Sequence, residues 1–291
     1  MTALSAAAPG RRQASAVSAT RMFDTLCLVV VVIFAVLWVL PTAFAVRTSL
    51  VENTTAAQGA TAIAGSGDLT LHSYLALFAQ GDVQNWYLSS AITSVLTVVL
   101  TLVTASMAAF ALSRLRFRGK RAVFLVVLAG IVIPGQVLIV PWFRELGAFG
   151  LLNTYWAVIL PQVPSAIAVF VFKQFFDGLP REIEEAALVE GAGPWTLYRR
   201  IVLPLSRPAV SAVAIFTFVW TWNNLLWPLI AVSNPALMTV PVGLATVQGS
   251  FGERYADVMA SSILGALPLV LLFLFFQRRI VEGVTSTGLK G

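Results

Sequence analysis

Seven residues of defined type and spacing lie between positions 185 and 204, and they indicate a docking surface. Glu185, Ala186 and Ala187 come first, Gly191 follows after three residues, and Ile201-Val202-Leu203-Pro204 closes the stretch after nine more. Small alanine side chains let another surface approach closely, and glycine permits a bend because it has no Cβ atom. These residue types let another surface approach closely, and they predict no covalent chemistry.

The surrounding residues predict two short helices joined at Gly191. Pro180 suits a first helical turn, and the glutamates that follow it lie where a helix N-terminus favours negative charge. Gly191 acts as a C-terminal stop, and Gly193-Pro194 restarts the chain. Four residues at i, i+3, i+4 and i+7 spacing share one side of the first helix, which another surface can approach closely. These residues are Ile183, Ala186, Ala187 and Glu190. An amphipathic helix lying on lipid is the alternative.

The composition excludes several classes of chemistry. The chain is 58% hydrophobic and 11% charged, which places it with integral membrane proteins, so its net charge of +6 does not indicate nucleic acid. Cys27 and His72 each occur alone, which argues against a disulfide framework and a metal site. The chain has no phosphate loop of the Gly-x4-Gly-Lys-Ser/Thr type, so it cannot hydrolyse ATP by that route. We expect a chain that is not an enzyme and that has no catalytic residue, metal site or cofactor of its own.

Six uncharged stretches are long enough to cross a membrane as helices. They cover residues 25–46, 87–112, 122–143, 151–172, 208–232 and 258–276. Prolines are expected to interrupt or end several of these helices, and such breaks often line transport paths. The prolines are Pro134, Pro161, Pro164, Pro228 and Pro268. The predicted organisation is an N-terminal segment 1–24, a six-helix domain 25–276 with a polar loop 173–207, and a tail 277–291.

Basic residues predict the topology. Sixteen of the 19 lysines and arginines lie in the N-terminal segment, the second and fourth connections and the tail, whereas the alternate connections hold only Arg47, Arg144 and Arg254. The positive-inside rule then places both termini and the polar loop in the cytoplasm of a multi-pass protein. A cleaved signal peptide ending at Ala43-Phe44-Ala45 is the alternative for the first stretch, although its apolar run is longer than the usual about 7–15 residues.

The pattern from Glu185 to Pro204 matches the EAA signature of permease subunits from ATP-binding-cassette (ABC) importers. Segments 116–120, 133–134, 222–228 and 281–291 resemble the carbohydrate branch related to the smaller permease of the maltose importer. The resemblance implies an all-α integral membrane fold of the type I importer class, with six transmembrane helices and a cytoplasmic coupling-helix loop, in a bacterial inner membrane. It is weakest over 47–85, where the Ala/Gly/Thr-rich stretch 54–67 is expected to be flexible.

The resemblance also implies partners. They are a second, different permease subunit, two ABC ATPases that bind ATP and Mg, and an extracytoplasmic solute-binding protein, all at a lipid membrane. The helix with Glu185 would dock into an ATPase cleft and face a basic residue there, Gly191 would permit the bend, and the tail would reach between the ATPases. The outer loop would touch the binding protein, unless it merely joins two helices. The contact candidates in that loop are Gln248, Gly249, Ser250 and Phe251.

Neutral amides and indoles are the candidates for a substrate path. No predicted span has a charged residue in its middle, which argues against a proton relay. Amides at membrane depth need a partner or water, and amides with indole faces suit the hydroxyls and C–H surfaces of a sugar. Four candidates are expected on one helical face, and a fifth lies in the third span. They are Trp220, Asn223, Asn224, Trp227 and Gln136. Helix packing with an interfacial tryptophan belt is the alternative.

These features predict the permease subunit of an ATP-driven bacterial sugar importer. One alternative is an importer of the same architecture for another polar solute, such as a glycerol phosphoester. A secondary transporter would need ionisable residues within the spans. A membrane-embedded enzyme would need a cluster of His, Asp or Glu at membrane depth, and the sequence has none.

Overall fold

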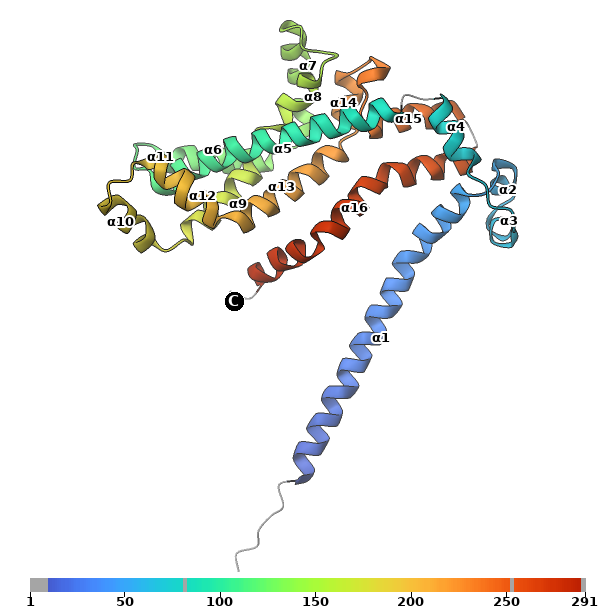
Figure 1. Ribbon diagram of the computed structural model, residues 1–291, viewed down its shortest axis with the longest axis horizontal. Helices are drawn as coiled ribbons and strands as arrows, with labels where there is room; N and C mark the ends of the chain where they lie inside the picture. The colour runs from blue at the N-terminus through green and yellow to red at the C-terminus, as the bar shows by residue number, and fades with distance from the viewer. Residues whose placement is uncertain (1–9, 81–82, 252–253, 289–291) are drawn as a thin grey trace, which may run out of the picture. The chain divides into compact units, whose positions relative to one another are not determined.

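The computed structural model describes the backbone of residues 10–80, 83–251 and 254–288, and the side chains of residues 22–79, 83–246 and 254–277. Every regular element in those ranges is a helix (Figure 1). The described residues divide into two compact units, one from residues 10–73 and 254–263 and the other from residues 74–80, 83–251 and 264–288. The all-α prediction is confirmed.

The first unit contains α1 (Gly10–Ser49), whose apolar part Met22–Ser49 has the length and hydropathy to cross a membrane. Two short helices follow, α2 (Asn53–Ala57) and α3 (Ala60–Gly65). Much of the stretch 54–67, which was expected to be flexible, is therefore helical.

Arg47 gives the physical reason for that difference. Its guanidinium donates to the carbonyl oxygens of Ile63 at 2.8 Å, Ala64 at 3.0 Å and Ser66 at 2.7 Å. These carbonyls lie at the C-terminal end of α3, where backbone oxygens lack helical partners and a cation is favourable. One side chain thus stabilises a helix that its own sequence does not indicate.

The second unit is built around α5 (Val83–Arg114), with α9 (Ala166–Asp177) and α13 (Arg207–Trp222) packed along it (Figure 1). The buried side of α5 is lined with small hydroxyl residues, which let neighbouring helices approach closely. They are Ser89, Ser90, Thr93, Ser94, Thr97, Thr101 and Ser106. This close contact makes α5 the common neighbour of the other helices.

Three predicted spans are broken. In the third, α6 (Lys120–Val132) bends by 96° into residues Gly135–Ala148, which form η1 and α7. In the fourth, Tyr155–Gln162, made of α8 and η2, bends by 46° into α9. In the fifth, α13 stops and α14 (Leu226–Ala231) starts anew. Residues Pro194–Leu205 and α13 form a further bent pair, with an angle of 76° between them. Within the described residues, three helices are long and apolar enough to cross a membrane alone. Up to six crossings result if this pair and the bent pairs in the third and fourth spans each count as one.

Prolines lie at some of these breaks, but not every predicted proline break occurs. Pro134 and Pro164 lie at bends, where proline lacks the N–H that a helix needs. The carbonyl oxygen of Val163, freed by the second bend, accepts a hydrogen bond from the Thr101 hydroxyl at 3.2 Å. Pro268, in contrast, lies inside α16 (Tyr255–Gly288), which runs on without interruption. The predicted break at Pro268 is therefore wrong.

Several helix bounds differ from the predicted segments. Helix α1 begins within the segment 1–24, α16 ends within the tail 277–291, and α9 extends into the loop 173–207. The other elements are α4 (His72–Gln80), η1 (Gly135–Leu138), α7 (Ile139–Ala148), α8 (Tyr155–Ile159), η2 (Leu160–Gln162), α10 (Arg181–Val189), α11 (Pro194–Thr196), the π-helix η3 (Leu197–Val202), α12 (Leu203–Leu205), η4 (Pro235–Leu237) and α15 (Val240–Phe251).

Candidate functional site

Helix α10 carries the Glu-Ala-Ala triplet and ends at a bend. The N–H of Gly191 donates to the Leu188 carbonyl at 3.0 Å, and the N–H of Ala192 donates to the Ala187 carbonyl at 2.9 Å. These two bonds are those of a Schellman motif, which closes a helix with a left-handed residue. Gly191 is that residue, with φ of +82°. Glycine adopts this conformation without the penalty of a Cβ atom.

Ala187 lies on the inner side of α10. Its side chain is buried in a hydrophobic cluster that the second half of the loop contributes to through Leu197, Tyr198 and Val202. Phe176 of α9 belongs to the same cluster. The loop is therefore packed against the helices of its own chain.

The opposite side of α10 faces outward. Glu185 and Ala186 are exposed, and so are the apolar side chains of Leu188 and Val189, the latter 89% exposed. Both alanines were expected on one docking side, but only Ala186 is exposed. Consecutive residues of a helix point about 100° apart, so neighbours can fall on different sides. The exposed surface of α10 thus combines the carboxylates of Glu182 and Glu185 with apolar side chains.

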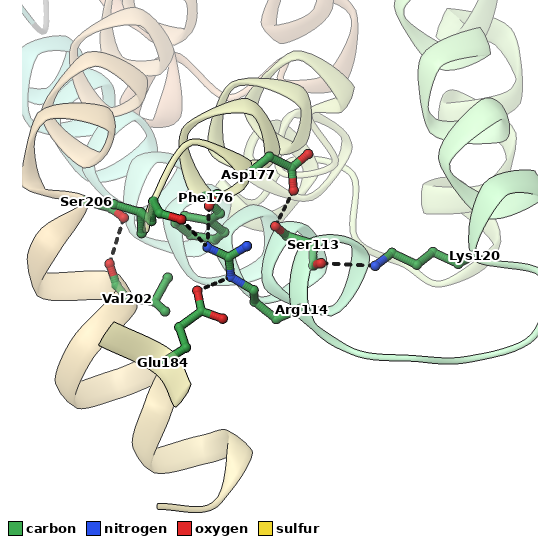
Figure 2. Close-up of polar contacts among 9 residues, drawn as sticks. Ser113, Arg114, Lys120, Phe176, Asp177, Glu184, Val202 and Ser206 are labelled. Atoms are coloured by element: carbon green, nitrogen blue, oxygen red, sulfur yellow. Dashed lines mark hydrogen bonds and ion pairs between the residues drawn. The ribbon is translucent and has the colours of Figure 1, made fainter. Parts of the chain in front are cut away.

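Arg114 joins α5 to α10 through an ion pair with Glu184 (Figure 2). The two side chains are 6% and 13% exposed. The Nη2 atom of Arg114 also donates to the carbonyl oxygen of Phe176 at 2.5 Å and to that of Leu179 at 3.4 Å. Burial raises the pKa of Glu184, although the neighbouring Arg114 favours the ionised carboxylate.

Further polar contacts hold the adjacent helix ends together. The Ser113 hydroxyl donates to Asp177 at the end of α9, and Lys173 donates to the other carboxylate oxygen at 2.5 Å. Lys120, the first residue of α6, donates to the carbonyl oxygens of Ser113 at 3.0 Å and Leu115 at 3.2 Å (Figure 2). The ends of α5, α6 and α9 therefore form one polar junction beside α10.

The second half of the loop contains a π-helix, a rare form that is frequent at functional sites. Its Tyr198 hydroxyl lies 2.8 Å from the Ser106 hydroxyl of α5, and its ring lies 5.3 Å from that of Phe110. This residue fixes the second half of the loop to α5.

The three remaining coupling candidates follow directly. Ile201 and Leu203 are partly buried against the same hydrophobic cluster, and Pro204 is exposed in the first turn of α12. Proline fits this position because the first turn of a helix needs no N–H donor. Ile201 and Leu203 thus pack inside the chain.

Two amides of the predicted path meet different partners. Asn224 lies between α13 and α14, and its side-chain N–H donates to Oε1 of Gln162 at 2.9 Å. Gln162 in turn donates to the Val158 carbonyl at 2.8 Å. Asn223 donates to the Val219 carbonyl of its own helix at 2.9 Å and remains exposed. Of these two amides, only that of Asn224 links two broken spans.

The path candidates do not share one helical face. Helix α13 ends at Trp222 and α14 begins at Leu226, so Trp220 and Trp227 belong to different helices. Trp220 is exposed, as is Gln136 in η1. The prediction of one face is wrong because the chain breaks between the two tryptophans.

Trp227 is a packed residue. Its indole is buried, its Nε1–H donates to the Ala157 carbonyl at 2.9 Å, and its ring meets that of Trp142 edge to face at 5.4 Å. The hydrogen-bonding group that a sugar would use is therefore occupied within the chain.

The outer-loop candidates lie at the end of α15, and their side chains are outside the described residues. They are Gln248, Gly249, Ser250 and Phe251. In the part of the chain that is described, no group of three or more His, Cys, Asp or Glu side chains could hold a metal ion.

Two residues of the site were not predicted as such. Arg114 contributes to the sequence analysis only as a positive charge, and Gln162 does not contribute at all. A signal for Gln162 exists, because it lies between Pro161 and Pro164, where a helix break is expected. The partner of Arg114 lies 70 positions away in the sequence, and no local pattern indicates that pairing.

Comparison with known proteins gives a consistent result. Residues 101–283 match a family model described as a binding-protein-dependent transport system inner membrane component. The chain is 36% identical over 262 residues to the arabinooligosaccharides transport system permease protein of Halalkalibacterium halodurans, covering 90% of this chain and 92% of the relative. It is 35% identical over 228 residues to the trehalose transport system permease protein of Mycobacterium tuberculosis, covering 77% and 83%.

A solved structure supports the fold. The chain resembles a bacterial ABC transporter involved in the import of the acidic polysaccharide alginate, with a TM-score of 0.77 and 19% sequence identity. The match covers 89% of this chain and 97% of that chain. The predicted type I importer permease fold is confirmed.

Proposed function

This chain belongs to the family of binding-protein-dependent transport system inner membrane components, and we propose that it is the permease subunit of an ATP-driven bacterial sugar importer. The observation that carries the proposal is the two-sided packing of α10. Ala187 packs on the inner side against the chain's own helices, while Glu185 lies exposed on the outer side. A helix that packs on one side and is exposed on the other can transmit the movement of a docked partner to the spans.

The partner on the outer side would be an ABC ATPase. Glu185 offers a carboxylate to a basic residue there, and docking would bury the exposed side chains of Leu188 and Val189. Full burial of one such apolar side chain contributes about 1.5–3 kcal/mol. The left-handed Gly191 sets the angle between this helix and the rest of the loop. Two ATPases would hold ATP and Mg, and this chain would supply no cofactor site.

The transport cycle would begin when the two ATPases close on ATP. Their movement displaces α10, and the displacement reaches the spans because Ala187 and Tyr198 pack against α5 and α9. The spans of this chain and of a second, different permease would then switch a central cavity from inward-facing to outward-facing. This chain performs no covalent step.

A sugar is the cargo that the relatives favour. Permeases for arabinooligosaccharides and for trehalose are each at least 35% identical to this chain. The half-buried amides of Gln162 and Asn224 offer donors and acceptors to sugar hydroxyls at the breaks of two spans.

The remaining parts of the proposal concern orientation and the outer partner. Both termini and α10 would lie in the cytoplasm, as the distribution of basic residues indicates. A solute-binding protein would dock outside, near Gln248–Phe251, which suits a family that depends on binding proteins.

Uptake in a deletion strain tests this function. Cells lacking the gene would be supplied with labelled arabinooligosaccharide and trehalose, with and without a plasmid copy of the chain. A second strain would carry an ATPase subunit whose phosphate-loop lysine is replaced. We expect uptake of at least one sugar to require both the chain and the active ATPase. Uptake that continues without ATP hydrolysis would overturn the proposal.

A further inference from the structure

One arginine side chain meets three separate elements of the second unit. Arg114 is the last residue of α5, pairs with Glu184 of α10 and donates to the carbonyl oxygens of Phe176 and Leu179 at the end of α9 (Figure 2). The planar guanidinium has five N–H donors in a fixed fork, so a single side chain can serve several acceptors in different directions.

The burial of this pair makes the two residues act as a unit. Arg114 and Glu184 are 6% and 13% exposed, and removing either would leave the other charge without its counter-ion in a site that water barely reaches. The nearby pair of Lys173 and Asp177 differs, because both of its residues belong to α9 and they are 17% and 39% exposed. The ion pair itself lies within one helix, although the Asp177 carboxylate also accepts from the Ser113 hydroxyl of α5. Only the first pair connects α10 to a span.

The other attachments of α10 permit movement. At its C-terminal end the chain turns through the left-handed Gly191, and on its inner side Ala187 contributes a single methyl group to the hydrophobic cluster. A small apolar contact has no preferred direction, whereas a charge-assisted hydrogen-bonding pair fixes distance and orientation. Without the ion pair, α10 could pivot about its ends.

We propose that Arg114 is a positioning residue that fixes α10 to the end of α5, so that a displacement of α10 reaches α5 directly. The inference rests on the coupling role proposed above for α10. Helix α5 packs along α9 and α13, and a movement received at its end would therefore be shared by the spans.

A distance between two spin labels tests this proposal. One label would be placed on α5 at Met107 and the other at the end of α10 at Glu190, both of which are exposed, after Cys27 has been replaced by Ser. The complex would be purified with its companion permease and ATPases. We expect one narrow distance distribution for the unaltered pair, and loss of that narrow distribution with Arg114→Gln. The exposed Arg121, changed to Gln, is the matched control from the same basic connection and should leave the distribution unchanged.

A charge-retaining variant separates positioning from packing. Arg114→Lys keeps the ion pair, so we expect a narrow distribution in the presence of Glu184 and a broad one when Glu184→Gln is added. If the Arg114→Gln subunit does not accumulate in the membrane, the two variants with Arg114→Lys still test the proposal. An Arg114→Gln distribution equal to that of the unaltered protein would overturn the proposal. So would an Arg114→Lys distribution that does not depend on Glu184.

The measurement is independent of transport. The distance can be recorded whatever solute the importer carries, and co-purification of the ATPases with the unaltered chain reports separately on the proposed function. A complex that assembles and transports normally while Arg114→Gln leaves the distance unchanged would refute only the role of Arg114.

Discussion

The side-chain amide of Asn224 donates to Oε1 of Gln162 across 2.9 Å, and each residue lies where a different span is broken. Asn224 falls between α13 and α14, and Gln162 ends η2 just before the bend into α9. Broken helices at membrane depth expose polar backbone, which neighbouring side chains must satisfy. The bond between these amides holds the two breaks together and leaves further amide groups for a polar solute.

Replacing Asn224 by Leu should lower uptake without lowering the amount of subunit in the membrane. The change leaves the half-buried Gln162 oxygen without its donor, and a lost hydrogen bond of this kind costs about 0.5–1.5 kcal/mol. Asn223→Leu is the matched neighbour, because Asn223 bonds only to a carbonyl of its own helix among the contacts described. We expect Asn223→Leu to lower uptake less than Asn224→Leu does. Uptake at several sugar concentrations measures transport by the two variants, and immunoblots of the membrane fraction measure the amount of subunit. Normal uptake by Asn224→Leu would show that Asn224 does not belong to the substrate path.

Gly191 and Gly193 form a matched pair for the coupling loop. A Cβ atom added to either would meet no atom within 4 Å, but φ is +82° at Gly191 and −73° at Gly193. An L-residue in the left-handed conformation costs roughly 1–2 kcal/mol. Gly191→Ala should therefore weaken coupling, measured as solute imported per ATP hydrolysed, while Gly193→Ala should not. Equal ratios in the two variants would show that the bend does not matter.

The sequence predicts the helical class, the approximate spans and the bend at Gly191, because these depend on local composition. Long uncharged stretches and the αL preference of glycine need no knowledge of distant residues. The helix at 60–65 escapes prediction because Arg47 stabilises it from outside the segment.

The site is predicted only in part, for a related reason. The side of α10 that packs inward depends on where Tyr198 and Phe176 lie, so the spacing of Ala186 and Ala187 alone does not separate them. The break after Trp222 likewise has no proline at the break itself and is set by tertiary packing. Pairings such as that of Arg114 with Glu184 require the fold.

Asn153 should be needed for the stability of the turn at Ser233. It has φ of +60°, and its Oδ1 accepts from the Ser233 N–H at 2.6 Å, the Ser233 hydroxyl at 2.9 Å and the Asn234 N–H at 3.1 Å. Asn153→Gly keeps the backbone conformation and loses these bonds, each contributing about 0.5–1.5 kcal/mol. Asn153→Ala loses the same bonds and also the ease with which the backbone adopts this left-handed conformation. We expect the melting temperature of the purified complex to fall in the order unaltered protein, Gly variant, Ala variant. An Ala variant as stable as the Gly variant would contradict the strain argument.

Cysteine labelling should confirm the proposed orientation. After Cys27 is replaced by Ser, single cysteines at Arg118 and Leu69, both exposed, would be treated with a membrane-impermeant thiol reagent on intact spheroplasts. Because basic residues crowd the connection around Arg118, we expect labelling only at position 69. Both positions should react after the cells are lysed, which controls for accessibility. Labelling at position 118 in intact cells would show that the topology is the reverse of the proposed one.

The coupling role of α10 is tested most directly by the number of solute molecules imported per ATP hydrolysed in proteoliposomes that contain the whole complex. The measurement would compare the unaltered chain with Glu185→Lys, which reverses one exposed charge of α10. Reversing a charge that pairs across a docked interface should lower this ratio by about tenfold or more, while the ATPases still co-purify with the variant. An unchanged ratio in a normally assembled Glu185→Lys complex would contradict the account.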